Sequence, residues 1–336
     1  MSTTGDNNDR QCGNGGEIVS NTKVNTSCEQ NNNNVDNITE GIDSIGVSDM
    51  STCANCGKEG NSTDMNTCNK CQSVKYCNAA CKKKHRKKHK KACEKRVAEL
   101  HEEKLFKEVE REECPICLIP LINGNQTESF MACCGKSICI GCIYAMKMSE
   151  GKDLCAFCRT PPPSSDEEQV KRLHKLMDKG NANAFDTLGA CYFSGTHGMP
   201  QDRQRANELY LKAGELGCAG AYYNLGNSYL NGRGIEVDMK KAKCYWELAA
   251  MGGCIPARVN VGSAEGKAGN HHRGMKHYII AAKAGDEETL EGVKKGFLAG
   301  LVTKDEYAST LREYQKIQDE MKSNAREKAE ASGMFR

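Results

Sequence analysis

The hydrophobic and polar positions divide the chain into stretches of different character. In residues 1–52 the apolar residues are isolated and show no period, and Asn, Gly, Ser, Thr and Asp dominate. Such a stretch buries too little apolar surface to offset the entropy lost on folding, so we expect a disordered low-complexity tail. Residues 94–113 are mostly charged, with a thin apolar stripe, which predicts a solvent-exposed linker helix.

From about residue 167 to residue 315 the apolar pattern repeats. The string Ala184-x3-Leu188-Gly189-x2-Tyr192 recurs from Ala221 and, in part, from Ala257, at offsets of 37 and 36 residues. Residues at i, i+4 and i+8 lie on one face of a helix. Periods of this size are typical of a solenoid in which each helix-turn-helix unit buries its apolar face against its neighbours. The fold class we predict is therefore multidomain, ending in an all-α repeat solenoid over 167–315 and a charged helical tail over 316–336.

The stretches between these segments hold most of the cysteines. Fifteen of the 21 cysteines lie between Cys53 and Cys158, nearly all in pairs, and His89 falls in step with them. In an intracellular chain such pairs indicate zinc, because two thiolates three residues apart can hold one tetrahedral ion from a single turn. The sixteen ligands predict four zinc ions, two in each of two cross-braced modules, residues 53–93 and 114–160.

The ligands expected in the first module are Cys53, Cys56, Cys68, Cys71, Cys77, Cys81, His89 and Cys93. The first and third pairs would hold one ion, and the second and fourth pairs the other. His85 could compete with His89, which we favour. With Tyr76 before Cys77, the string resembles a MYND zinc finger, which implies a structural, protein-binding domain that often takes proline-containing peptides. Lys82 and Arg86 replace the glutamine and tryptophan usual in that family.

Residues 82–96 carry ten Lys or Arg residues and one Glu. One interpretation is nuclear import or contact with nucleic acid. The other, which we favour from sequence, is a solvated helix face that offsets the negative charge of the thiolate–zinc clusters. On that interpretation nucleic acid is not an expected partner.

The second module resembles a RING finger of the all-cysteine kind. Its ligands would be Cys114, Cys117, Cys139 and Cys142 for the first zinc, and Cys133, Cys134, Cys155 and Cys158 for the second. Adjacent Cys133 and Cys134 replace the usual Cys-x-His, and Gly135 after them fits a tight turn. Because all eight ligands would be thiolates, neither site keeps a position for water, and we expect structural rather than catalytic zinc.

The RING resemblance implies that the module positions a ubiquitin-conjugating enzyme and its bound ubiquitin for transfer, without a nucleophile of its own. It assigns Ile116 as the apolar contact for the conjugating enzyme and Arg159 as the cation that bridges enzyme and ubiquitin. Ala156 stands where the family usually has proline, and the helix after Cys142 lacks the usual tryptophan. The repeats resemble Sel-one-like repeats, relatives of the tetratricopeptide class, which implies an adaptor surface for other proteins.

These features predict a RING-type ubiquitin ligase or ligase component whose repeats and MYND-like finger recruit a protein substrate. The alternative is a zinc-organised scaffold without transfer activity, and nucleic-acid binding through residues 82–96 is a weaker third possibility. Bulk composition adds little, because the net charge is only +3 and the mean hydropathy is −0.65. Since no signal peptide or membrane-length apolar run is evident, we expect a cytoplasmic or nuclear protein with no membrane partner.

Overall fold

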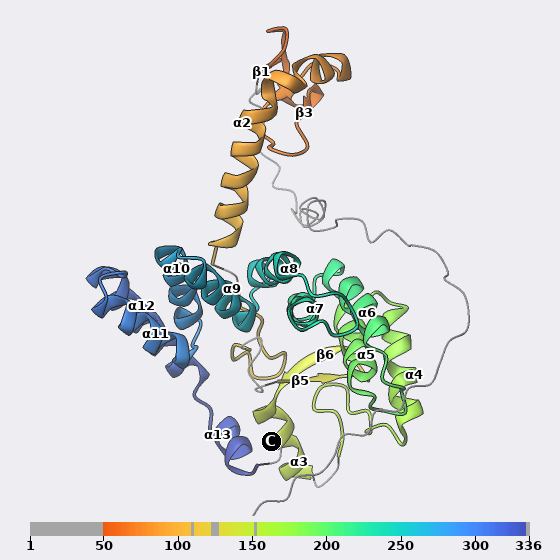
Figure 1. Cartoon of the computed structure of the whole chain (residues 1–336). Coiled ribbons are helices and arrows are strands. Elements are labelled where there is room, and N and C mark those ends of the chain that lie inside the picture. Colours follow the sequence, from red (N-terminus) through yellow and green to blue (C-terminus); the bar gives the residue numbers. More distant parts are fainter. Residues whose placement is uncertain (1–49, 109–110, 122–127, 151–152, 334–336) are drawn as a thin grey trace, which may run out of the picture. The chain divides into compact units, whose positions relative to one another are not determined.

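The computed structural model describes residues 50–108, 111–121, 128–150 and 153–333, so residues 1–49 of the expected tail (1–52) lie outside these ranges. The first module consists of two short antiparallel hairpins and the start of a long helix (Figure 1). Strand β1 (Met50–Thr52) pairs with β2 (Glu59–Asn61), and β3 (Asn66–Thr67) pairs with β4 (Lys75–Tyr76). A 3-10 turn, η2, covers Ser62–Asp64. Met50–Thr52 thus form a strand, although the sequence pattern placed them in the tail, because pairing with β2 closes the first cysteine turn.

The charged helix differs from its expected bounds. Helix α2 (Ala79–Leu105) begins inside the first module and runs through it without a break (Figure 1). Residues 106–108 and 111–113 are not helical. The helix is also not solvent-exposed throughout, because Leu105 is fully buried and its carbonyl accepts a 2.8 Å hydrogen bond from the guanidinium of Arg258. Periodicity cannot show this anchor, since it joins residues 153 positions apart.

The second module is a hairpin followed by a helix. Strand β5 (Glu128–Met131) pairs with β6 (Lys136–Cys139), with Met131 opposite Lys136, and α3 (Ile140–Glu150) follows directly. Gly135 turns the hairpin with φ +71°, as expected from its sequence position. Ile138 is fully buried among the cysteines, and these side chains are the centre of a very small core.

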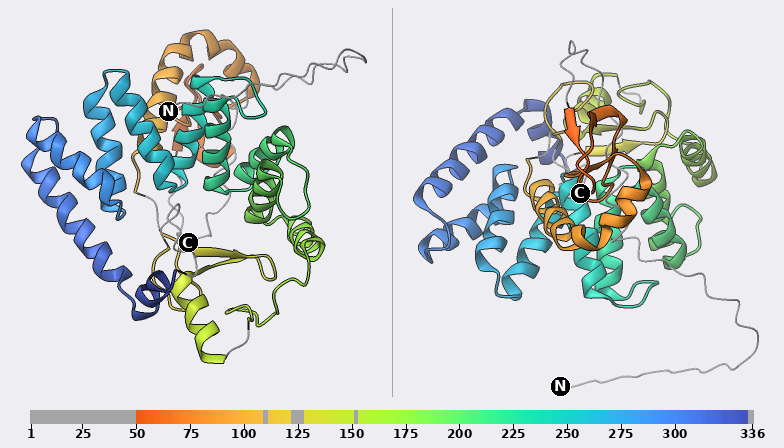
Figure 2. Two further views of the ribbon diagram at one scale, coloured as in Figure 1. Left: turned by 60° about the horizontal axis from the view of Figure 1, so that its bottom comes forward. Right: turned by 90° about the horizontal axis from the view of Figure 1, so that it is seen from above.

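The rest of the chain is helical, as the repeat pattern predicts. The helices are α4 (Asp166–Met177), α5 (Ala182–Ser194), α6 (Arg203–Glu215), α7 (Ala219–Asn231), α8 (Met239–Met251), α9 (Ile255–Lys267), α10 (His271–Lys283), α11 (Glu287–Leu298), α12 (Lys304–Met321) and α13 (Asn324–Ala331). Consecutive helices pack against each other in pairs: α5 on α6, α7 on α8, and α9 on α10 (Figure 2). The expected boundary at residue 315 falls inside α12, and the tail contributes a separate short helix, α13.

The glycine in each repeat string explains how the paired helices approach one another. A Cβ atom on Gly189 would lie 2.9 Å from the ring of Tyr210, and one on Gly226 would lie 2.5 Å from the indole of Trp246. Gly262 stands in the same relation to Tyr278, at 2.7 Å. The aromatic rings of the second helices therefore rest on bare backbone of the first helices. Tyr229, Tyr245 and Trp246 are at most 4% exposed and belong to the core, whereas Tyr192 of the first string is half-buried at its margin.

Candidate metal centres

The first module brings its eight predicted ligands together in two interleaved groups. Cys53, Cys56, Cys77 and Cys81 form one group, and Cys68, Cys71, His89 and Cys93 form the other. The ligand atoms of each group lie within 4.8 Å of one another. His89 and Cys93 lie one helical turn apart on the buried face of α2, while Asn78 caps that helix by accepting from the N–H of Cys81. This interleaving staples two hairpins to a helix in a segment with little other core.

The second module makes the same arrangement from sulfur alone. Cys114, Cys117, Cys139 and Cys142 form its first group, and Cys133, Cys134, Cys155 and Cys158 form its second. The adjacent pair Cys133 and Cys134 lies in the turn of the β5–β6 hairpin, and both side chains belong to one group. The residues that the structure describes thus form four clusters that could bind zinc, grouped as the sequence pattern paired them.

The sulfur separations fit a tetrahedral zinc ion. Four ligands 2.3 Å from one centre place their sulfur atoms about 3.8 Å apart. The Sγ atoms of Cys56 and Cys77 are 3.7 Å apart, and those of Cys114 and Cys142 are 3.8 Å apart. A disulfide would need about 2.05 Å. The clusters therefore have the size of zinc sites and contain no disulfides among these cysteines.

The thiol pKa values point to a bound cation. In the first cluster the backbone N–H of Cys77 lowers the pKa of Cys53 to about 6, whereas hydrogen bonding with Cys81 raises the pKa of Cys77 to about 12. In the second cluster desolvation raises the pKa of Cys93 to about 12. Four thiolates cannot coexist in one such cluster at neutral pH without a cation, and Zn²⁺ would supply the charge that keeps them ionised.

The two candidate histidines have different surroundings. The Nε2 atom of His89 lies 3.2 Å from the Sγ of Cys71, and the side chain is buried. His85 stacks on His89 at 5.8 Å between ring centroids, but its Nδ1 bonds the hydroxyl of Tyr76 at 3.2 Å. His85 therefore supports the ring of the ligand, and the geometry favours His89 as the residue that completes the second cluster.

Four cysteine turns share a backbone feature that the sequence pattern did not reveal. In each, the N–H of the residue four positions after the first cysteine donates to that cysteine's carbonyl, at 2.9 Å. The donor residue has a positive φ in every case: Gly57 (73°), Gln72 (53°), Leu118 (59°) and Arg159 (63°). Only one of the four is glycine, the residue that usually indicates a positive φ, so the residue types do not predict this turn. Arg159, singled out for ubiquitin transfer, is thus also a turn residue of the last cluster.

Exposed apolar side chains gather near the second module's cysteine turns. Ile116 and Leu118, in the first turn, are 42% and 67% exposed, and Phe157, in the last turn, is 46% exposed. Met148 on α3 is 57% exposed. The guanidinium of Arg159 lies against the same helix, with Nη1 2.8 Å from the sulfur of Met146. Several large apolar groups exposed within one small module mark a surface that a partner can cover, whereas a single exposed apolar residue is ordinary.

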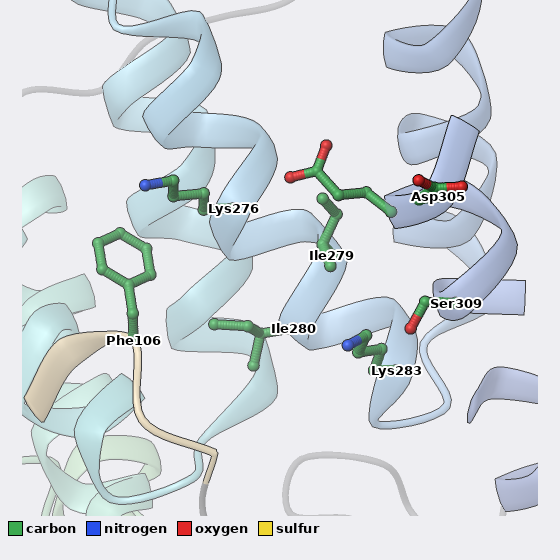
Figure 3. A pocket seen from close by; sticks show the side chains of 8 residues that line it. Phe106, Lys276, Ile279, Ile280, Lys283, Asp305 and Ser309 are labelled. Carbon is green, nitrogen blue, oxygen red and sulfur yellow. The ribbon is translucent and has the colours of Figure 1, made fainter. Parts of the chain in front are cut away.

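The solenoid has a cleft of about 470 Å³ between α10 and α12 (Figure 3). Ile279 and Ile280 form its floor, and Phe106 borders it. Its two lysines have local partners: the ammonium of Lys276 lies 5.6 Å from the ring centroid of Phe106, and Lys283 pairs with Glu108 at 3.8 Å. The isoleucines and Phe106 make part of the lining apolar, which suits docking of an apolar side chain of a partner.

Comparison with known proteins supports the first module and the repeats. Residues 53–93 match the family model of the MYND finger. Residues 188–218, 219–254 and 256–286 match that of the Sel1 repeat. The second module is defined by its cysteine clusters alone. Among the described residues, no helix is both long enough and apolar enough to span a membrane.

The similar proteins are matched over short segments. Two ERAD-associated E3 ubiquitin-protein ligase components of Arabidopsis thaliana, HRD3A and HRD3B, are 33% and 34% identical over 25% of this chain, which is 13% and 15% of their own length. Chitin synthase regulatory factor 4 of Schizosaccharomyces pombe is 31% identical over 38% of this chain and 20% of its own length. A Sel1 repeat protein from Oxalobacter formigenes has 25% identity and a TM-score of 0.38, covering 45% of this chain and 62% of that one. The chain therefore carries a MYND finger and Sel1 repeats, modules of a protein-interaction adaptor.

Proposed function

We propose that this adaptor is a RING-type ubiquitin ligase or ligase component. Its second module would dock a ubiquitin-conjugating enzyme, and its MYND finger and repeats would hold the protein to be modified. The observation that carries the proposal is the exposure of apolar side chains at two cysteine turns, with Ile116 and Phe157 presented by backbone that two metal clusters would fix. A rigid apolar surface of this kind suits transfer by positioning, which needs no nucleophile in the ligase.

Similarity to ligase components supports the same proposal. The relatives HRD3A and HRD3B are named as components of a ubiquitin ligase, and the chain resembles them over a quarter of its length. Sel1 repeats beside a zinc-stapled module would bring a substrate within reach of a docked enzyme. Proline-containing peptides are candidate ligands of the MYND finger, although Lys82 and Arg86 replace the family's usual groove residues.

The test is ubiquitin transfer by the full zinc-loaded chain with a panel of conjugating enzymes. Ile116→Ala should lower transfer at least tenfold, because an exposed anchor at the centre of an interface contributes about 2 kcal/mol. Leu298→Ala is the matched control, since Leu298 is 76% exposed on α11. Transfer that survives Ile116→Ala with every active enzyme would overturn the docking site.

Arg159 supplies a second variant. Arg159→Ala should abolish transfer with four zinc ions still bound, because Ala and Arg meet the same backbone cost at a positive φ. Arg159→Lys should restore little, since an ammonium lacks the planar fork that bridges two proteins. Full activity of the alanine variant would exclude the proposed role.

The alternative is a scaffold without transfer activity, and one observation favours it. Helix α13 packs on α3, and Arg326 donates to the carbonyls of Ile119 and Pro120 beside the first cysteine turn. Part of the second module thus already serves an internal contact. Four bound zinc ions with no transfer by any enzyme of the panel would establish the scaffold.

A further inference from the structure

Helix α2 presents seven basic residues to solvent, which we call the basic arc: Lys83, Lys84, Arg86, Lys87, Lys88, Lys90 and Lys91, all of them exposed. At 100° per residue they cover about 200° of the helix circumference. The ligands His89 and Cys93 lie on the opposite face, buried against the metal cluster. The arc is therefore wider than a single stripe and contains no apolar side chain.

The zinc clusters do not neutralise this charge. Residues 53–93 contain eleven Lys or Arg residues and two acidic residues. Seven thiolates on two Zn²⁺ ions would add only about three negative charges. The module stays strongly positive, although the whole chain has a net charge of only +3. The solvated-face interpretation that the sequence favoured thus leaves most of the charge uncompensated.

Local ion pairs do not neutralise it either. Within the arc Lys90 pairs with Glu94 at 3.9 Å. In the part of the chain that the structure describes, the other six members have no carboxylate within 4.0 Å. The remaining acidic residues of α2 pair beyond the arc, Glu99 and Glu103 with Lys95 or Arg96 and Glu102 with Arg273. Unpaired lysines on one helix repel one another, and a polyanion would relieve that repulsion.

We propose that the basic arc binds duplex DNA by lying in its major groove. The groove is about 12 Å wide and an α-helix with side chains is about 10–12 Å across, so one helix meets phosphates on both walls. An arc of about 200° reaches both walls, whereas a flat anionic membrane would touch about half of it and would favour apolar anchors that the arc lacks. A-form RNA has a narrow major groove that would not admit the helix.

The arc would bind without reading sequence. Recognition of a base sequence needs side chains that make bidentate hydrogen bonds or apolar contacts with the base edges. The arc instead offers mainly flexible ammonium groups, which suit contacts with phosphates. This binding is independent of the proposed ubiquitin transfer, so either can fail without the other.

The test titrates a fluorescein-labelled 20-base-pair DNA duplex of arbitrary sequence with the full zinc-loaded chain. Fluorescence anisotropy measures the binding affinity at a series of salt concentrations. We expect a Kd of about 1 µM at 50 mM salt and a slope of log K against log salt of about −5, for five to six phosphate contacts. No binding at 50 mM salt overturns the proposal.

A triple variant tests the arc itself. K83Q/K87Q/K91Q should weaken binding at least tenfold and make the salt slope shallower by about 2.7, because three contacts are lost. Glutamine keeps the helix, and zinc content and circular dichroism should not change. The control removes three exposed lysines elsewhere, K240Q/K316Q/K328Q. An equal loss of affinity in the control would assign the binding to net charge and overturn the site.

Two further probes test the class of partner. A 20-base-pair RNA duplex and phosphatidylserine vesicles at equal accessible charge should each bind at least fivefold more weakly than DNA. Equal binding of RNA would overturn insertion into the major groove, and tighter binding of vesicles would overturn the nucleic-acid assignment.

Discussion

At the scale of single residues, the zinc clusters are decided by which side chain completes each set of four. The sequence leaves His85 and His89 one helical turn apart on α2. The structure separates them by their partners, because His89 faces the sulfur of Cys71 and His85 bonds Tyr76. Because metal binding supplies folding free energy to so small a module, the loss of one ligand should weaken the fold as well as the site.

His89→Ala should leave three zinc ions per chain instead of four, because the second cluster would keep three sulfur ligands and an opened position. His85→Ala should keep four ions and lower stability slightly through the lost contact with Tyr76. Metal analysis after gel filtration measures both. Four bound ions in His89→Ala and three in His85→Ala would show instead that His85 is the zinc ligand and His89 is not.

His277 is a buried histidine of α10 with an unusual environment. It is fully buried, neither ring nitrogen has a hydrogen-bond partner among the described residues, and its ring lies 4.7 Å from that of Phe106. Desolvation, followed by repulsion from Arg258 and Arg273, lowers its pKa to about 3. Its other charged neighbours are Glu265 and Lys243.

The depressed pKa predicts acid sensitivity. The unfolded chain takes up the proton at about pH 6.5, whereas the folded chain resists it, so stability is full above pH 6.5 and falls as the pH drops toward 3. One such group costs about 2 kcal/mol between pH 8 and pH 5. His277→Leu should remove this loss and raise the free energy of unfolding at pH 7. Urea unfolding of both proteins at each pH isolates the difference from any loss of zinc, and parallel pH profiles would contradict it.

At the scale of elements, α2 joins two kinds of structure. Its first turns belong to a metal-stapled module, and its last turn is fixed to the solenoid by Arg258, which is 1% exposed and donates to the carbonyls of Leu105 and Ala250. Burial lowers the pKa of Arg258 to about 10, so it stays charged at neutral pH. Arg273 forms ion pairs with both Glu102 on α2 and Glu265 on α9, and so also links the two helices.

Arg258→Leu should release the end of α2. The two carbonyls would lose their donor, at a cost of about 2–4 kcal/mol. Hydrogen exchange should then quicken at residues 98–106 and change little in α5 and α6. Arg312→Leu, on the exposed side of α12, is the control. Unchanged protection of α2 in Arg258→Leu would show that the hydrogen bonds do not hold the helix.

At the scale of the whole molecule, the second module makes contacts with two later segments of the chain that are far apart in sequence. Asn181, at the start of α5, donates to the carbonyl of Gly135, and α13 packs on α3. The contact with α13 depends on a glycine, because a Cβ on Gly141 would lie 2.8 Å from the backbone nitrogen of Arg326.

Gly141→Ala should therefore destabilise the contact, although alanine is the better helix former by about 1 kcal/mol. Gly266→Ala is the matched control, since a Cβ there meets nothing within 4 Å on α9, and it should stabilise the chain by about 0.5–1 kcal/mol. Limited proteolysis between α12 and α13 should be faster in Gly141→Ala alone. Equal cleavage of the two variants would contradict the contact.

The sequence by itself determined the zinc ligand pairs and the repeat, because both depend on spacings of a few residues, and local backbone geometry fixes which of those residues lie together. Two cysteines three residues apart must share a turn, and alanine, leucine and tyrosine at helical spacing must share a face. Tertiary structure supplied the physical reason for His89 over His85, which the sequence had only favoured, and it alone decided that α2 ends on Arg258 and that α13 returns to α3. Most of these contacts join segments far apart in the chain. They depend on how the surfaces of the two segments fit together, which no periodicity in the sequence indicates.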